Sequence, residues 1–94
     1  MPTIINDAKW TEKNADGTRW IVQITGSGFK QNADVSDVLF ESDSVPEEQA
    51  LLVLGGDTIL NAQAFLVSRD GQQNQKVRVR GEDEVFSNWV QINS

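Results

Sequence analysis

Thr18-Arg19-Trp20-Ile21-Val22-Gln23-Ile24-Thr25, closed by Gly26-Ser27-Gly28, is the stretch of sequence that decides the fold. Its large apolar side chains Trp20, Val22 and Ile24 alternate with a second set of residues, and this period of two is typical of a β-strand. Asn14-Ala15-Asp16-Gly17, just before it, indicates a hairpin turn, because Asp-Gly tolerates the positive φ of tight hairpins. We therefore expect a strand over 18–25 that follows a hairpin and ends at the glycines.

Short apolar segments of this kind recur along the whole chain. Turn-forming residues separate them, including Asp70-Gly71 and an acidic loop over 42–49 in which Ser44 and Glu47 would form a capping box. Short strands with regular turns predict an all-β fold, a single immunoglobulin-like antiparallel β-sandwich of about seven strands that spans residues 1–94. The expected strands are 3–11, 18–25, 35–41, 51–54, 58–68, 75–80 and 85–93.

Two of these strands carry specific expectations. The segment 58–68 is apolar on both faces, which favours a central strand with a bulge. In the last two segments we expect Val77, Val79, Phe86, Val90 and Ile92 to point inward, with Lys76, Arg78 and Arg80 outward.

Composition excludes several classes of function. The chain has 94 residues, no cysteine and no histidine, so a thiolate or histidine zinc site and a histidine-assisted nucleophile are excluded. Eight basic residues against fourteen acidic ones give a net charge of -6, which argues against nucleic acid and against an anionic membrane. The sequence has no apolar run long enough to span a bilayer, and its first residues do not resemble a signal peptide. Neutral partners fit this charge best.

Three tryptophans are the strongest candidates for binding. By strand phase Trp89 is expected to point away from the core, beside Arg78, Asn88 and Gln91, where its ring could stack on a sugar while the polar groups bond hydroxyls. The alternative is that a loop or the other terminus buries Trp89. Trp20 is expected in the core with one edge at a rim, and Trp10 fits core and rim equally. Gln23 and Gln63 would add hydrogen-bonding groups if their strands share a face.

Two groups of acidic residues are further candidates for a functional site. Glu47/Glu48 and Glu82/Asp83/Glu84 lie in expected loops, where a solvated charge run explains them better than a catalytic pair of carboxylates. A second group could take calcium, which prefers several oxygen ligands, although its spacing matches no known calcium loop. That group is Asp34, Asp37, Glu41 and Asp43, with Asp57 further on.

Val22-Gln23-Ile24-Thr25-Gly26-Ser27-Gly28-Phe29 resembles the V-x-I-x-G-x-G-F signature of immunoglobulin-like IPT/TIG domains. The resemblance covers residues 18–92, and the opening Pro2-Thr3-Ile4-Ile5 departs from the family pattern. It implies a sandwich that serves as an accessory module of polysaccharide-degrading enzymes, surface receptors or DNA-binding factors. Size, tryptophan usage and amide content are also similar, more loosely, to a carbohydrate-binding module of a bacterial endoglucanase.

These observations lead to one hypothesis and two alternatives. The hypothesis is a non-catalytic module that binds β-linked glucan (cellulose, xyloglucan or mixed-linkage glucan), needs no cofactor, and is linked to a glycoside hydrolase domain in a secreted enzyme. The first alternative is a structural or protein-interaction domain of a phage particle or cell-surface assembly, located in the cytoplasm or the virion. The second is a spacer whose tryptophans are all buried.

Overall fold

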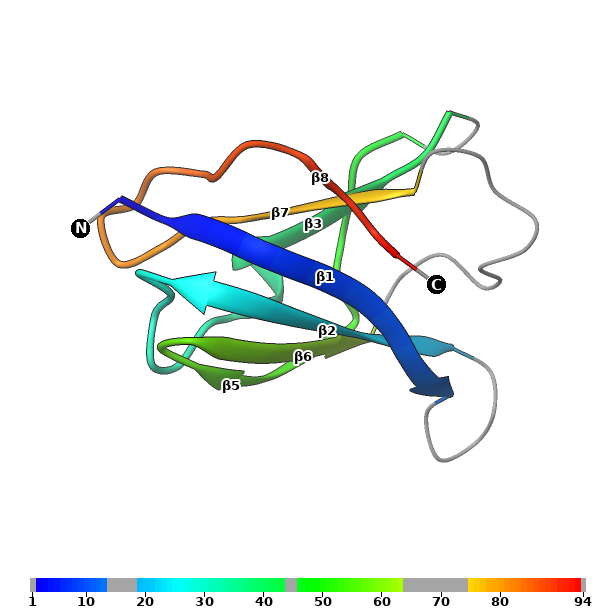
Figure 1. Ribbon diagram of the computed structural model, residues 1–94, viewed down its shortest axis with the longest axis horizontal. Coiled ribbons are helices and arrows are strands. Elements are labelled where there is room, and N and C mark those ends of the chain that lie inside the picture. Colours follow the sequence, from blue (N-terminus) through cyan, green and yellow to red (C-terminus); the bar gives the residue numbers. More distant parts are fainter. Residues whose placement is uncertain (1, 14–18, 44–45, 64–74, 94) are drawn as a thin grey trace.

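The protein is a sandwich of two antiparallel four-stranded sheets, which confirms the expected all-β fold (Figure 1). The computed structural model describes residues 2–13, 19–43, 46–63 and 75–93. In the first sheet the order is β1 (Ile4–Lys13), β2 (Trp20–Ser27), β6 (Ile59–Gln63) and β5 (Leu52–Gly56). In the second sheet it is β4 (Glu48–Gln49), β3 (Val38–Glu41), β7 (Lys76–Val79) and β8 (Val90–Gln91). The described residues thus form eight strands where we expected about seven.

The core lies between the sheets and is built from alternate residues of the strands. Val22 and Ile24 of β2 and Val77 and Val79 of β7 are fully buried, as their phase predicts. Phe29, which follows the glycines that end β2, is also buried. The inward side chains of both sheets therefore form one apolar cluster, as a sandwich of this size requires.

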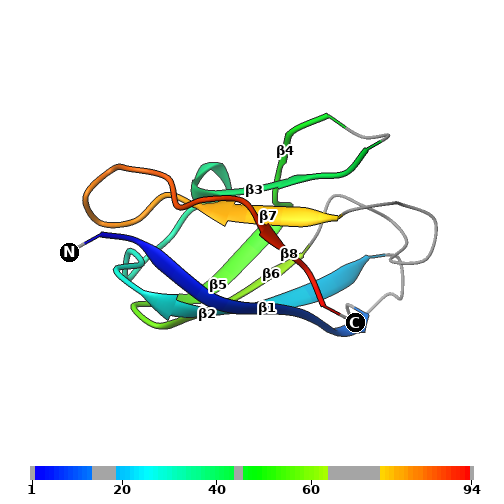
Figure 2. The same ribbon diagram turned by 45° about the horizontal axis from the view of Figure 1, so that its top comes forward.

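The chain changes sheets at two neighbouring residues, Ala50 and Leu51. The Ala50 N–H donates to the Val38 carbonyl of the second sheet at 2.9 Å, and the Leu51 N–H donates to the Gln63 carbonyl of the first sheet at 3.0 Å. β4 and β5 are thereby successive parts of one extended segment that belong to different sheets. On the opposite side, β1 closes the sandwich against the C-terminal segment, where the Trp10 N–H donates to the Asn93 carbonyl at 2.9 Å (Figure 2).

The expected strand over 35–41 is wrong in its first half. Val35–Asp37 is a short 3-10 helix, and the strand begins only at Val38. Asp34 caps this helix, because its side chain accepts from the Val35 N–H while Asp37 accepts from the Asp34 N–H at 2.9 Å. This reciprocal capping satisfies the first amides of the turn and holds the residues out of the sheet.

The expected strand over 85–93 is also wrong for most of its length. Only Val90–Gln91 forms a strand, while Phe86 and Asn93 make isolated bridges to Arg80 and Lys9. Ile92 is buried and Val90 packs against the core, as expected. Phe86 does not point into the core. It is partly exposed and lies against the side chains of Arg78 in β7 and of Arg80 just after it. The chain between 81 and 89 follows a turn and a loop with no continuous ladder, so Phe86 is not directed inward by strand alternation.

Several smaller expectations have definite outcomes. β2 continues through Gly26 to Ser27, and β5 continues through Gly55 and Gly56, where we expected both to end at the glycines. Within β6, Leu60 and Ala62 are buried and Ile59 is exposed, so this part of 58–68 has an ordinary inner face. The Asn14–Gly17 and Asp70-Gly71 turns, Ser44 of the proposed capping box, and the remainder of 58–68 lie outside the described residues.

Candidate functional site: an arginine held between two aromatic rings

Arg78 lies at the centre of an aromatic cluster on the outer face of the second sheet. Val77 and Val79 are buried on either side of it, so strand alternation directs Arg78 outward. Its guanidinium carbon lies 4.4 Å from the ring centre of Phe86 and 4.8 Å from that of Trp89. Both distances are within cation–π range. The sequence pattern predicts that Trp89 points away from the core. Its contact with the outward-facing Arg78 agrees with that prediction.

Glu47 holds this arginine in place, and Leu39 is its neighbour in the ladder. An Arg78 side-chain nitrogen donates to a Glu47 carboxylate oxygen at 2.7 Å, which is short for an ion pair. Leu39 is the register partner of Arg78 on β3 and is buried, although its phase points outward. One ion pair and two ring contacts therefore hold the guanidinium, and the Trp89 ring lies against this held group.

Polar residues neighbour the partly exposed Trp89 in the chain and across the ladder. Gln91 is exposed and pairs with Lys76 across the β7–β8 ladder, and Lys76 pairs in turn with Glu41 of β3. Asn88 is exposed and lines a shallow pocket between the start of β1 and the segment that leads into β8. The structure therefore brings Trp89, Arg78 and Gln91 to one face, whereas Asn88 lines a pocket with Val90 and the start of β1. We call the Trp89, Arg78, Phe86 and Gln91 side chains the Trp89 platform.

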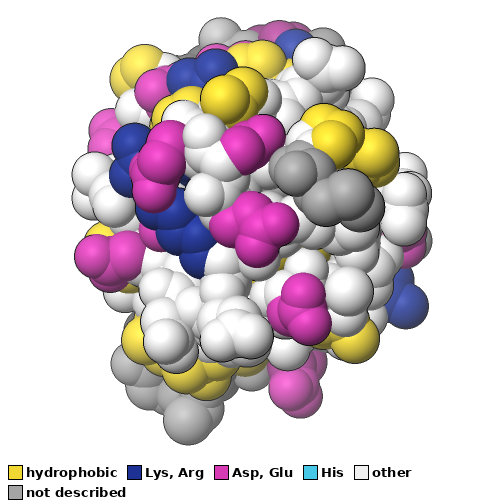
Figure 3. All heavy atoms as spheres, turned by 90° about the vertical axis from the view of Figure 1, so that its left-hand side faces the viewer, with side chains coloured by type: hydrophobic (Ala, Val, Ile, Leu, Met, Phe, Trp, Pro, Cys, Tyr) yellow, Lys and Arg dark blue, Asp and Glu magenta, His cyan; other side chains and the backbone are white. Residues whose placement is uncertain are grey.

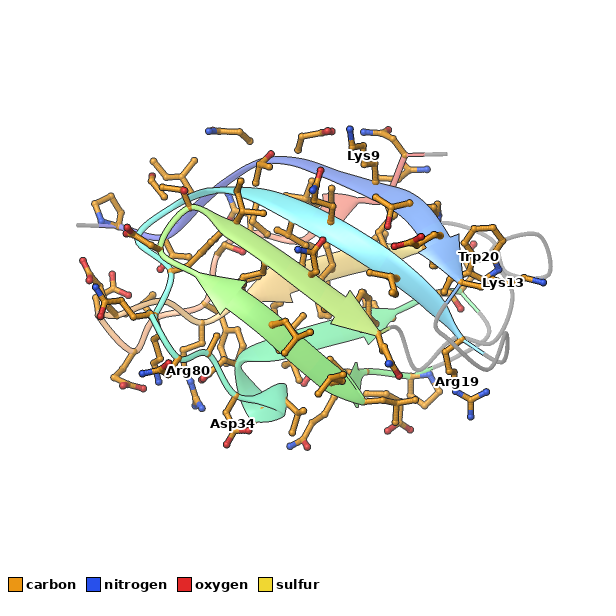
Figure 4. All side chains as sticks on the ribbon, turned by 90° about the horizontal axis from the view of Figure 1, so that it is seen from below. Lys9, Lys13, Arg19, Trp20, Asp34 and Arg80 are labelled. Atoms are coloured by element: carbon orange, nitrogen blue, oxygen red, sulfur yellow. The ribbon has the colours of Figure 1, made fainter. Side chains whose placement is uncertain are left out.

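The other two tryptophans form a separate pair in the first sheet. The ring centres of Trp10 and Trp20 are 6.2 Å apart at an interplanar angle of 77°, an edge-to-face arrangement. Trp10 is 8% exposed and belongs to the core, which resolves the two options left open for it. Trp20 is partly buried against the core at one end of the molecule, and the Lys13 ammonium lies 5.7 Å from its ring centre (Figure 4). Neither ring joins the Trp89 platform.

Gln23 and Gln63 also lie apart from the platform. Gln23 pairs with Asn61 and Gln63 pairs with Ile21 across the β2–β6 ladder, opposite in phase to the buried Val22, Ile24 and Leu60. These amides therefore share the outer face of the first sheet, as expected if their strands are neighbours. The sandwich separates them from Trp89, which lies just before β8 and packs against Arg78 of the second sheet.

A charged cluster lies at the end of the molecule where residues 81–84 turn (Figure 3). The buried carboxylate of Asp37 accepts from Lys30 at 3.2 Å and from Arg80 at 2.9 Å, and Glu84 contacts Lys30 at 2.9 Å. Burial would raise the pKa of Asp37. The backbone N–H of Asp34 and the two cations outweigh it and hold that pKa below its ordinary value. The hydrogen bond to Glu84, with Asp37 in support, raises the pKa of Lys30.

This cluster bears on the expected calcium site. Asp37 faces two cations, and among the residues that the structure describes no three acidic side chains converge in a way that could hold a metal ion. Calcium binding by Asp34, Asp37, Glu41 and Asp43 stays a prediction without a coordination group to support it.

Sequence reasoning missed two members of the site, Phe86 and Glu47. Alternation is compatible with Phe86 in the core and also with Phe86 packed on an outward arginine. It therefore could not distinguish these two positions of the ring. Glu47 lies 31 positions from Arg78 in the chain, and nothing in the sequence links the two residues. Only the path of the chain through β4 brings that carboxylate to β7.

Comparison with known proteins gives no match at the level of a family model, a curated protein or a solved structure. In the part of the chain that the structure describes, no helix is long and apolar enough to cross a membrane.

Proposed function

We propose that this domain is a non-catalytic carbohydrate-binding module that takes β-linked glucan on the Trp89 platform. The observation that carries the proposal is the Trp89 ring, partly exposed and fixed against Arg78, with the exposed Gln91 beside it. A fixed indole loses little conformational entropy when an apolar sugar face stacks on it. The amide of Gln91 can bond hydroxyls at the rim of the stacked ring.

Charge balance on this face supports a neutral ligand. Glu47 neutralises Arg78, and Glu41 and Lys76 occupy opposite positions in the β3–β7 ladder. A neutral polysaccharide meets little uncompensated charge there, whereas an anionic chain would find Arg78 already paired with Glu47. In this proposal the domain holds a linked glycoside hydrolase near its substrate, so that its benefit is effective concentration.

The state of the acidic residues supports a role without catalysis. A general acid in glycoside hydrolysis needs a raised pKa. The pKa of Asp37, the one buried carboxylate among the described residues, is lowered by its hydrogen-bond donors. Its two cation contacts suit a structural ion pair.

The proposal is tested by calorimetric titration with soluble β-glucan and cello-oligosaccharides. We expect Trp89→Ala to weaken binding by about 1–3 kcal/mol, the usual cost of removing an aromatic anchor. Gln91→Ala should weaken binding by a smaller amount. Its matched control is Gln23→Ala, the same substitution on the outer face of the other sheet, which should leave the affinity unchanged. Equal losses for the two glutamine variants, or no binding by the unmodified domain, would refute the proposal.

A second candidate, a protein-interaction domain, has one observation in its favour. Four aliphatic side chains around β5 and the start of β6 are more than two-fifths exposed, namely Leu51, Leu52, Leu54 and Ile59. They lie around the first sheet, away from the Trp89 platform, so the two functions do not compete for one surface.

A further inference from the structure

The edge of the first sheet at β5 is apolar and open. β5 ends the strand order of that sheet, and within the described ranges no strand pairs with its far side (Figure 4). Leu52 is 43% exposed and Leu54 is 60% exposed, both directed to the outer face. Alternate peptide groups of such an edge strand direct their N–H and C=O groups away from the sheet, where they can bond a further strand.

The other three edges of the sandwich carry features that discourage pairing. β1 presents the exposed charges Lys9, Glu12 and Lys13. β4 is two residues long and carries Glu48, with Glu47 just before it. β8 is equally short, and the residues after it bond to β1. Charged or short edges are how β-proteins avoid pairing with other chains, and β5 has neither device.

The distribution of charge favours a second copy of the chain as the occupant of this edge. Residues 51–63 contain one charged side chain, Asp57, in a protein whose net charge is -6. Two copies repel each other over most of their surfaces. The uncharged β5 edge is a place where they can meet without placing like charges opposite each other, so it suits an identical partner.

The sequence of β5 is also complementary to itself. In an antiparallel pair centred on Val53, Leu52 of one copy lies opposite Leu54 of the other, and Leu54 lies opposite Leu52. Both leucines point to the outer face, so each cross-strand pair on that face joins two leucines. The pairing uses Leu52 to Leu54 and ends before the glycines, since Gly55 has a positive φ and Gly56 lies against the loop at Lys30 and Gln31.

We propose that two copies of this chain pair through β5 into a symmetric dimer in which the two first sheets form one continuous eight-stranded sheet. The contact is small, since it consists of two short strands and their leucines. Small interfaces are weak, so we expect a concentration-dependent equilibrium of monomer and dimer. The proposal is independent of the Trp89 platform, which lies on the other sheet.

Sedimentation velocity over a range from about 10 µM to about 1 mM tests this, because weak dimers dissociate within that range. The mass should rise with concentration from 10.4 kDa toward twice that value. Leu54→Lys should weaken association at least tenfold. Val85→Lys is the matched control, since Val85 is also 60% exposed, takes the same new charge, and lies in the loop after the 81–84 turn. A constant monomer mass, or equal weakening by both substitutions, would overturn the proposal.

Disulfide trapping tests the register in a chain that has no cysteine of its own. Leu52→Cys and Leu54→Cys lie opposite each other across the dimer axis, at the separation of directly paired strand residues, which suits a disulfide. A mixture of the two variants should therefore cross-link faster than either variant alone. Equal rates in all three samples would contradict the pairing centred on Val53.

Discussion

At the scale of single residues, the side chains that organise the surface are those whose contacts join distant parts of the chain. Arg78 joins β7 to Glu47 near β4 and to the rings of Phe86 and Trp89. Asp37 joins the 3-10 helix to Lys30 and to Arg80. In both cases one charged side chain contacts several partners and thereby holds a loop against a strand.

Asp37 should contribute to stability in a way that depends on pH. We expect Asp37→Asn to lower the free energy of unfolding at pH 7 by about 1.5–3 kcal/mol, the usual value for hydrogen bonds to a charged group. The pKa of Asp37 is lower in the folded protein than its ordinary value of 3.8, so this stabilisation is complete above that value and is lost as the pH falls through the folded-state pKa. Urea denaturation at a series of pH values measures the difference.

The control for this experiment is Glu82→Gln, which removes the same charge from an exposed position in the 81–84 turn. It should change the free energy of unfolding by less than about 0.5 kcal/mol, as surface substitutions usually do. If Asp37→Asn behaved like Glu82→Gln at every pH, the buried ion pairs would have no net effect on stability.

At the scale of elements, strand phase was a good guide where a strand is regular and a poor one where the chain leaves the ladder. Val22, Ile24, Val77 and Val79 are buried as their alternation predicts. The segment around Phe86 alternates equally well but is mostly loop. Alternation reports which residues could share a face. It cannot show that an aromatic ring packs against an outward arginine instead of entering the core.

The order of strands could be predicted only where a hairpin turn joins two neighbours, as it does for β1 and β2. β4 pairs with β3 and β5 pairs with β6, so the chain changes sheets between Ala50 and Leu51, and no turn signal in the sequence marks that change. For the candidate site, the phase of Arg78, Trp89 and Gln91 placed three members on one face. The sequence could not show that Trp10 and Trp20 pair with each other, because that contact depends on the β1–β2 register.

The end of β2 provides a prediction at this scale. Gly28 has φ of +80°, and a Cβ there would lie 2.7 Å from the Pro2 carbonyl oxygen. We expect Gly28→Ala to lower the free energy of unfolding by about 1–3 kcal/mol, because a side chain is strained in that conformation and meets backbone. Thermal denaturation measures this. Ser27→Ala, one residue earlier, is the control and should change the melting temperature little. A Gly28→Ala variant as stable as that control would refute the geometry at this turn.

At the scale of the whole molecule, the two outer faces have different chemistry. The outer face of the second sheet carries rings, amides and paired charges, and the first sheet has an uncharged aliphatic edge. A dimer through β5 would leave both Trp89 platforms free, since they lie on the other sheets. Ligand binding and self-association can therefore be measured separately.

Salt and chelator test the nature of the ligand. Binding of a neutral glucan releases no counterions, so its affinity should change less than about twofold between about 50 mM and 300 mM salt, despite the net charge of -6. A chelator should have no effect if the platform alone binds the glucan. An affinity that fell steeply with salt would indicate a charged ligand, and loss of binding with chelator would indicate calcium at the acidic residues around Asp37.

The most direct test of the central claim is the NMR signal of the three indole N–H groups during titration with cellohexaose. The chain contains three tryptophans, so Trp10 and Trp20 serve as internal controls in the same sample. We predict that the Trp89 signal shifts progressively to saturation while the signals of the Trp10–Trp20 pair stay in place. Shifts confined to Trp20, or no shift of any signal at saturating sugar, would contradict the assignment of glucan binding to the Trp89 platform.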